Sequence, residues 1–111
     1  MGGKRTLREK AIIEGLSNSQ VLEQLEGLAG HLNISVRYEK GDFSNGYCLV
    51  DDTEILFLKQ TEPEFRKIDF LMKELSKYDF EAFQLHPDLS AKMIQLKDEL
   101  INNQNPDKER L

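Results

Sequence analysis

Apolar residues recur at helical spacing in three parts of the chain. In each part they fall mostly three or four positions apart with polar residues between them, which is typical of an amphipathic helix. The pattern predicts a helix from about residue 18 to Leu32, a second that begins near Thr61, and a third that follows His86. The apolar stripes are Val21, Leu22, Leu25, Leu28, Ala29 and Leu32; Phe65, Ile68, Leu71, Met72 and Leu75; and Leu89, Met93, Leu96 and Leu100.

Capping signals mark where two of these helices begin. Ser17 or Asn18 is a suitable N-cap for the first helix, because a short polar side chain can accept a hydrogen bond from a free backbone N–H. Thr61 and Glu64 have the spacing of a capping box, and Pro63 suits a first helical turn. The second helix is therefore expected to begin at this box.

Three stretches between the first two helices alternate in the way that strands do. Residues 34–38 read Ile-Ser-Val-Arg-Tyr, and residues 47–50 and 54–59 are joined by the turn signal Asp51-Asp52-Thr53. The last two stretches predict an antiparallel hairpin. Both of its faces carry apolar residues, so we expect it to be central and partly covered on both sides. Residues 83–85 form a candidate fourth strand at the edge of the sheet.

The predicted fold class is α+β. We expect an antiparallel sheet of three strands, or four with residues 83–85, packed against three or four helices in two layers. The fourth helix would be a short one from about Leu7 to Glu14, after a Thr6-x-x-Glu9 capping box. We expect the chain to consist of an N-terminal arm or short helix (1–17), a single domain (18–102) and a disordered tail (103–111).

Charge and composition exclude several classes of function. The net charge of the 111 residues is −5, and the only basic cluster is a short arm formed by Lys4, Arg5, Arg8 and Lys10. An acidic body does not favour nucleic acid, because phosphate contacts need clustered Lys and Arg. No apolar run reaches the length of about 20 residues that spans a bilayer. We therefore expect a cytoplasmic protein with neither nucleic acid nor membrane as partner.

One N-terminal motif bears on the membrane. The residues Met1-Gly2-Gly3-Lys4-Arg5-Thr6 fit the template for N-myristoylation. Tethering through this modification is a minor alternative, since one acyl chain anchors a protein only weakly.

Cys48 is the only cysteine, and it raises the question of a reactive thiol. A cysteine nucleophile needs a base within hydrogen-bond reach, and the two histidines, His31 and His86, lie in no catalytic motif. Strict alternation places Cys48 and Val50 on one face of the hairpin, so Cys48 is expected to be a small buried hydrophobe. The chain has no zinc, calcium or phosphate-loop motif, so we expect no metal, no cofactor and no catalytic residues.

The loop "KGDFSNGY" (residues 40–47) is the most suggestive surface feature. It holds Phe43 between two glycines and Tyr47 directly after the second, and aromatic residues on loops are frequent in recognition. The alternative is that Phe43 folds back over the sheet, as large aromatics are usually buried. The candidate binding residues are Phe43, Gly46, Tyr47 and Cys48.

Three segments carry a resemblance to a protein family. The runs "LAGHLNISVRYE", "GDFSNGYCLVDDTEILFLKQTEPEFRKIDFLMKEL" and "FQLHPDLSAKMI" resemble a group of short bacterial proteins of unknown function, with a G-x-C hairpin at Gly46-Tyr47-Cys48. The resemblance covers about residues 20–100 and implies no activity. The order of elements is also similar to that of zinc peptidases that cleave phage repressors. Those enzymes carry H-E-x-x-H, whereas the corresponding helix here reads "FRKIDFLMKEL".

These observations favour a non-enzymatic protein-interaction or regulatory module, either with a protein partner or as a homodimer. An open sheet edge at residues 83–85 would accept another strand. The alternative is a small enzyme or redox sensor that uses Cys48.

Overall fold

The computed structural model describes residues 12–103, which form three helices and one three-stranded sheet. The α+β fold is confirmed. Residues 12–16 form bends and turns, and the rest of the predicted helix at 7–14 and most of the predicted tail lie outside the described residues. The elements are α1 (Asn18–His31), β1 (Ile34–Glu39), β2 (Gly46–Val50), β3 (Thr53–Lys59), α2 (Glu64–Leu75) and α3 (Pro87–Asn103).

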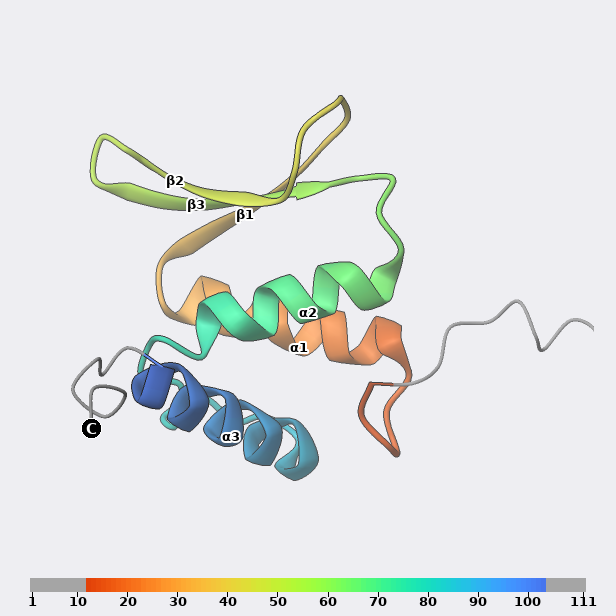
Figure 1. The fold of residues 1–111 in the computed structure, drawn as a ribbon, viewed down its shortest axis with the longest axis vertical. Coiled ribbons are helices and arrows are strands. Elements are labelled where there is room, and N and C mark those ends of the chain that lie inside the picture. Colours follow the sequence, from red (N-terminus) through yellow and green to blue (C-terminus); the bar gives the residue numbers. More distant parts are fainter. Residues whose placement is uncertain (1–11, 104–111) are drawn as a thin grey trace, which may run out of the picture.

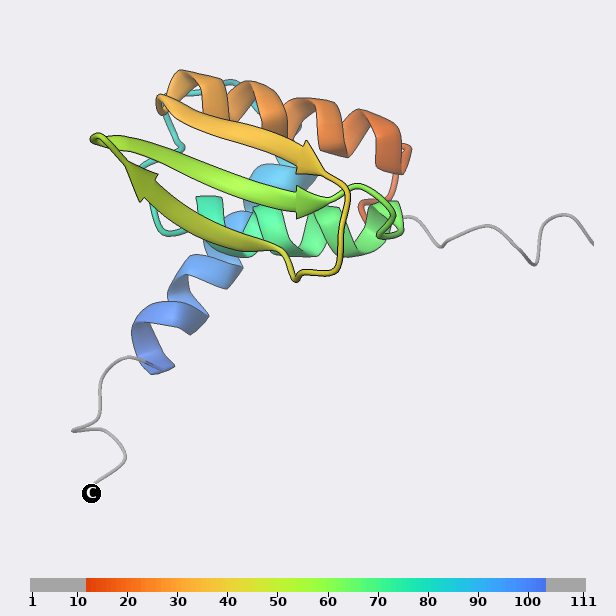
Figure 2. The same ribbon diagram turned by 90° about the horizontal axis from the view of Figure 1, so that it is seen from above.

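The sheet is mixed, so the prediction of an antiparallel sheet was wrong. Its order is β1-β3-β2, with β1 parallel to β3 and β2 antiparallel to β3. The hairpin of β2 and β3 formed as expected, but β1 does not pair with β2. After β1 the chain passes through residues 40–45 to the far edge of the sheet, and β3 then returns between the other two strands (Figure 2). The central strand is therefore β3, and β2 lies at an edge.

The predicted fourth strand is absent from the described residues. Residues 83–85 lie in the irregular connection between α2 and α3. The ring of Phe83 packs on α1 instead: its centroid is 5.4 Å from that of His31. A Cβ atom at Gly27 would be only 3.2 Å from Cζ of Phe83. The glycine thus lets this connection approach α1 closely, and the segment is not free to pair with a strand.

The helices cover one face of the sheet. Helices α1 and α2 lie side by side beneath it, and α3 packs on their far side (Figure 1). The helical part is thus two tiers deep, so two layers were too few. Leu56 and Leu58 of β3 are buried on the helix side. No described helix covers the opposite face, so the helices cover the hairpin on one side only.

The start of α1 follows its sequence signals and the start of α2 does not. Ser17 caps α1 and forms a capping box with Gln20. Helix α2 begins at Glu64 with Pro63 as its N-cap and without a side-chain cap. The predicted box of Thr61 and Glu64 therefore does not form, because proline occupies the cap position and places Thr61 outside the helix.

Two leucines of the hairpin allow a matched test of this packing. Leu58 is 0% exposed in the central strand, whereas Leu49 is 58% exposed in the edge strand. We expect Leu58→Ala to lower the free energy of unfolding by about 2–5 kcal/mol, because it leaves a cavity in the core. Leu49→Ala is expected to change it by no more than about 0.5 kcal/mol. Urea unfolding of both variants measures the difference, and equal effects would contradict the assignment of β3 as the central strand and β2 as an edge strand.

Candidate functional site at the edge strand

The outer edge of β2 has backbone groups that pair with no other strand among the described residues. Asp51 and Asp52 have φ of 49° and 67°, as a two-residue type I′ turn requires. Such a turn makes the flanking residues, Val50 and Thr53, a hydrogen-bonded pair. Hydrogen-bonded and non-hydrogen-bonded pairs then alternate along the hairpin. The N–H and C=O groups of residues 47 and 49 therefore point away from β3, at the free edge.

The side chains of β2 do not protect this edge. The strand reads Gly-Tyr-Cys-Leu-Val and contains no charged residue and no proline. Tyr47, Leu49 and Val50 are 47%, 58% and 46% exposed. The other edge strand, β1, carries the exposed charged residues Arg37 and Glu39, which are of the kind that discourage strand addition. Only β2 thus combines unpaired backbone groups with exposed apolar side chains.

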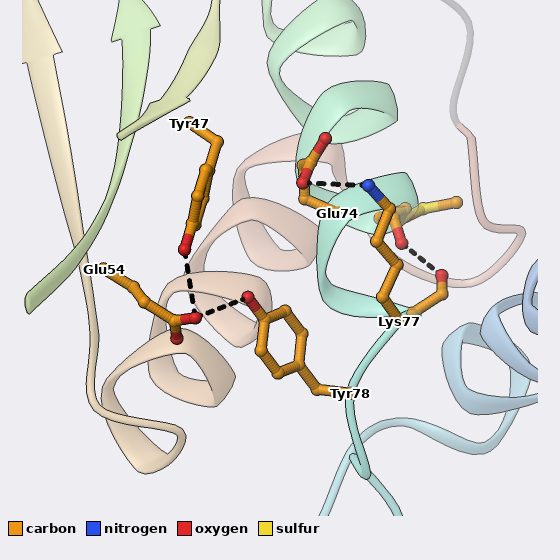
Figure 3. Close-up of polar contacts among 7 residues, drawn as sticks. Tyr47, Glu54, Glu74, Lys77 and Tyr78 are labelled. Carbon is orange, nitrogen blue, oxygen red and sulfur yellow. Dashed lines mark hydrogen bonds and ion pairs between the residues drawn. The ribbon is translucent and has the colours of Figure 1, made fainter. Parts of the chain in front are cut away.

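A carboxylate holds Tyr47 in place beneath the edge. The hydroxyl groups of Tyr47 and Tyr78 each donate a hydrogen bond to Oε2 of Glu54, both at 3.2 Å (Figure 3). Tyr47 belongs to β2, Glu54 to β3, and Tyr78 to the segment after α2. A single oxygen atom therefore links the edge strand, the central strand and the end of the second helix.

The tyrosines of this cluster resist ionisation. Desolvation, the charge of Glu54 and the hydrogen bond to it raise the pKa of Tyr78 to about 12 from an ordinary value of 10.0. The same causes raise the pKa of Tyr47. In the opposite edge strand, β1, burial and a hydrogen bond to Glu26 raise the pKa of Tyr38. Tyr47 and Tyr78 are therefore neutral hydrogen-bond donors at physiological pH and supply no base or nucleophile.

The loop before β2 forms one wall of two shallow hollows. One, of about 420 Å³, lies between this loop and α2, and the other, of about 480 Å³, lies beside β2 itself. The half-buried ring of Phe43 borders both. Asn45 fixes the loop, because its Oδ1 atom accepts a hydrogen bond of 2.7 Å from the backbone N–H of Lys59. The first hollow is lined by Phe43, Ser44, Asn45, Lys59, Glu62, Arg66, Asp69, Phe70 and Lys73.

The structure brings the four predicted binding residues together around β2, but in different settings. Tyr47 is exposed at the edge, Phe43 is partly folded back, and Gly46 opens β2. Cys48 is half-buried and pairs with Ile55, so its side chain lies on the uncovered face of the sheet. The face assignment from sequence is thus confirmed, whereas full burial of the thiol is not.

Neither histidine lies against Cys48. The ring of His31 contacts Phe83, and Nδ1 of His86 accepts a hydrogen bond from the backbone N–H of Asp88. The backbone N–H of His86 also donates to Gln24 on α1, at 2.8 Å. Both histidines thus belong to the helical part, and no Cys–His pair forms among the described residues.

The described residues do not meet the requirements of a metal site or of a membrane-spanning helix. Within residues 12–103 no group of three or more His, Cys, Asp and Glu side chains is placed to hold a metal ion. No helix in this part of the chain is long and apolar enough to cross a membrane. The basic arm and the myristoylation template lie outside the described residues.

No protein family, curated protein or solved structure matched the chain in three separate comparisons. The family resemblance drawn from the sequence therefore stays a prediction. The residues that sequence reasoning missed at this site are Leu49, Val50, Glu54 and Tyr78. The run of five uncharged residues in β2 was a visible signal for the first two. No local pattern links Glu54 with Tyr78, which lies 24 positions further along the chain.

Spectrophotometric titration tests the tyrosine cluster. We expect Glu54→Gln to lower the pKa of Tyr47 and Tyr78 toward 10 while Tyr38, which has another partner, keeps its raised value. Because the folded pKa of Tyr78 exceeds its unfolded value, its contribution to stability is present below pH 10 and is lost as the pH rises toward 12. If the pKa values of all three tyrosines are unchanged in the variant, Glu54 does not interact with Tyr47 or Tyr78.

Proposed function

We propose that this protein is a non-enzymatic protein-interaction module that binds a segment of a partner protein as an additional strand along β2. The observation that carries the proposal is the combination at this edge: backbone groups that point outward, an uncharged strand, and three exposed apolar side chains. Strand addition gives affinity through main-chain hydrogen bonds and specificity through alternate side chains.

The surroundings of β2 support such binding. Each backbone hydrogen bond to an added strand contributes about 0.5–1.5 kcal/mol net. The ring of Tyr47 is already oriented by Glu54, and the preceding loop is fixed by Asn45. A partner strand would therefore meet an edge that is largely ordered in advance, which reduces the entropy lost on binding.

The alternative, an enzyme or redox sensor that uses Cys48, has less support. No histidine contacts the thiol, and it lies on a sheet face rather than in either hollow. Its side chain is half-buried at the level of Ile55. A paired base is what a cysteine nucleophile requires, and the described residues supply none.

A photo-crosslinking amino acid at position 49 tests the proposal in the native host. Leu49 is 58% exposed on β2, and Ile101 is 57% exposed on α3, so position 101 provides a control of equal accessibility. We expect a discrete protein adduct from position 49 and none from position 101. Equal labelling at both positions, or no adduct at position 49, would overturn the proposal.

A further inference from the structure

We infer that the strand added to β2 is β2 of a second copy of this chain, so that two sheets join into one continuous six-stranded sheet. This inference rests on the proposed function and names the partner. The two copies would be related by a two-fold axis through the backbone at Cys48. The register, the side chains and the charges at this edge each support this arrangement.

Symmetry and backbone geometry determine the register. Two identical edges that meet about a two-fold axis must run antiparallel. The outward N–H and C=O groups belong to residues 47 and 49, so these residues must form the hydrogen-bonded pairs. An axis at Cys48 pairs Tyr47 with Leu49 of the second copy and keeps all five residues of β2 paired. An axis at position 47 or 49 would leave residues at the strand ends unpaired.

The side chains that meet in this register fit one another. Tyr47 and Leu49, both exposed on the helix side of the sheet, pack against each other across the axis. On the open face, Val50 meets Gly46 of the second copy, which has no side chain to obstruct it. Cross-strand pairs of aromatic and aliphatic residues stabilise antiparallel sheets. The pairing thus covers all three of the exposed apolar side chains of β2.

An acidic tip lies at one end of β2, and a hollow with one lysine that is unpaired among the described residues lies at the other. Asp51 and Asp52 form the exposed hairpin tip, and in this register they meet Asn45 and Ser44 of the second copy. These two residues line the hollow that also holds Lys59, Arg66 and Lys73, against two acids, Glu62 and Asp69. Arg66 and Lys73 already pair with these acids at 3.7 and 3.1 Å. Lys59 has no ion pair within residues 12–103 and is the cation available to the incoming tip.

Disulfide trapping tests both the partner and the register. In this arrangement the two Cys48 residues form a non-hydrogen-bonded pair with Cα atoms about 4.5 Å apart. That separation lies within the range of about 4.4–6.8 Å that a disulfide needs. Diamide takes up the two hydrogens of the paired thiols, so a covalent dimer would form through Cys48, the only cysteine in the chain. We expect rapid formation of a species with the mass of two chains.

Moving the thiol provides the control for random collision. In the double variant Cys48→Ser, Val50→Cys, the two thiols would lie about 14 Å apart along the paired strands, too far for a bond. Position 50 is nevertheless the more accessible one, since Val50 is 46% exposed and Cys48 is half-buried. If disulfides formed only by random collision between monomers, the more accessible cysteine at position 50 would crosslink faster than Cys48. We expect the native cysteine to crosslink at least about tenfold faster, and the reverse order would overturn the inference.

Sedimentation of the reduced protein completes the test. We expect a dimer for the native chain and for Ile101→Lys, but a monomer for Leu49→Lys, because a lysine at a strand edge opposes pairing. A native chain that is monomeric and forms no Cys48 disulfide would overturn this inference. The photo-adduct at position 49 separates that failure from failure of the proposed function. An adduct with a different protein would support the proposed interaction module but contradict the homodimer. The absence of any adduct would contradict both.

Discussion

The structure depends on the insertion of β3 between β1 and β2. This strand pairs on both sides, in parallel with β1 and antiparallel with β2, and it presents Leu56 and Leu58 to the helices. Helices α1 and α2 can cover the sheet because β3 supplies a continuous buried row along its middle. The same insertion moves β2 to the edge. The strand order β1-β3-β2 therefore produces both the core and the exposed edge on which the proposed function rests.

The edge strand and the helices are connected by polar contacts as well as by packing. Glu54 accepts hydrogen bonds from a tyrosine of β2 and from Tyr78, which follows α2. Lys77, next to Tyr78, contacts Glu74 at 3.3 Å, so a surface ion pair also joins this segment to the last turn of α2 (Figure 3). The position of the edge is thus tied to the helical part. If a partner binds along β2 as proposed, we expect the backbone of a surface supported in this way to move little.

Local patterns in the sequence were enough to predict the elements but not their arrangement. The helical stripes, the cap at Ser17 and the hairpin turn all act over a few residues, and the structure confirms them. The order of the strands could not be predicted in this way, because the alternation of apolar and polar residues along β1 is compatible with either β2 or β3 as its neighbour. In the segment Phe83-Gln84-Leu85 apolar and polar residues alternate as they do in a strand. The ring of Phe83 nevertheless packs against Gly27 of α1, where a larger residue would leave no room for it. The candidate residues Phe43, Gly46, Tyr47 and Cys48 were chosen from local sequence alone, whereas the outward backbone groups of β2 follow only from the observed register.

The strand order also bears on how the chain folds. In the hairpin the closest pair, Val50 and Thr53, is separated by a turn of two residues, so pairing can begin locally. Every residue of β1 instead pairs with one that lies 20 positions further along, from Ile34 with Glu54 to Glu39 with Lys59. Closing that longer loop costs more chain entropy and yields no contact until β3 is in place. We therefore expect β2 and β3 to assemble first and β1 to dock afterwards. During that interval the nascent sheet has two open edges, and the addition of β1 closes the one on β3.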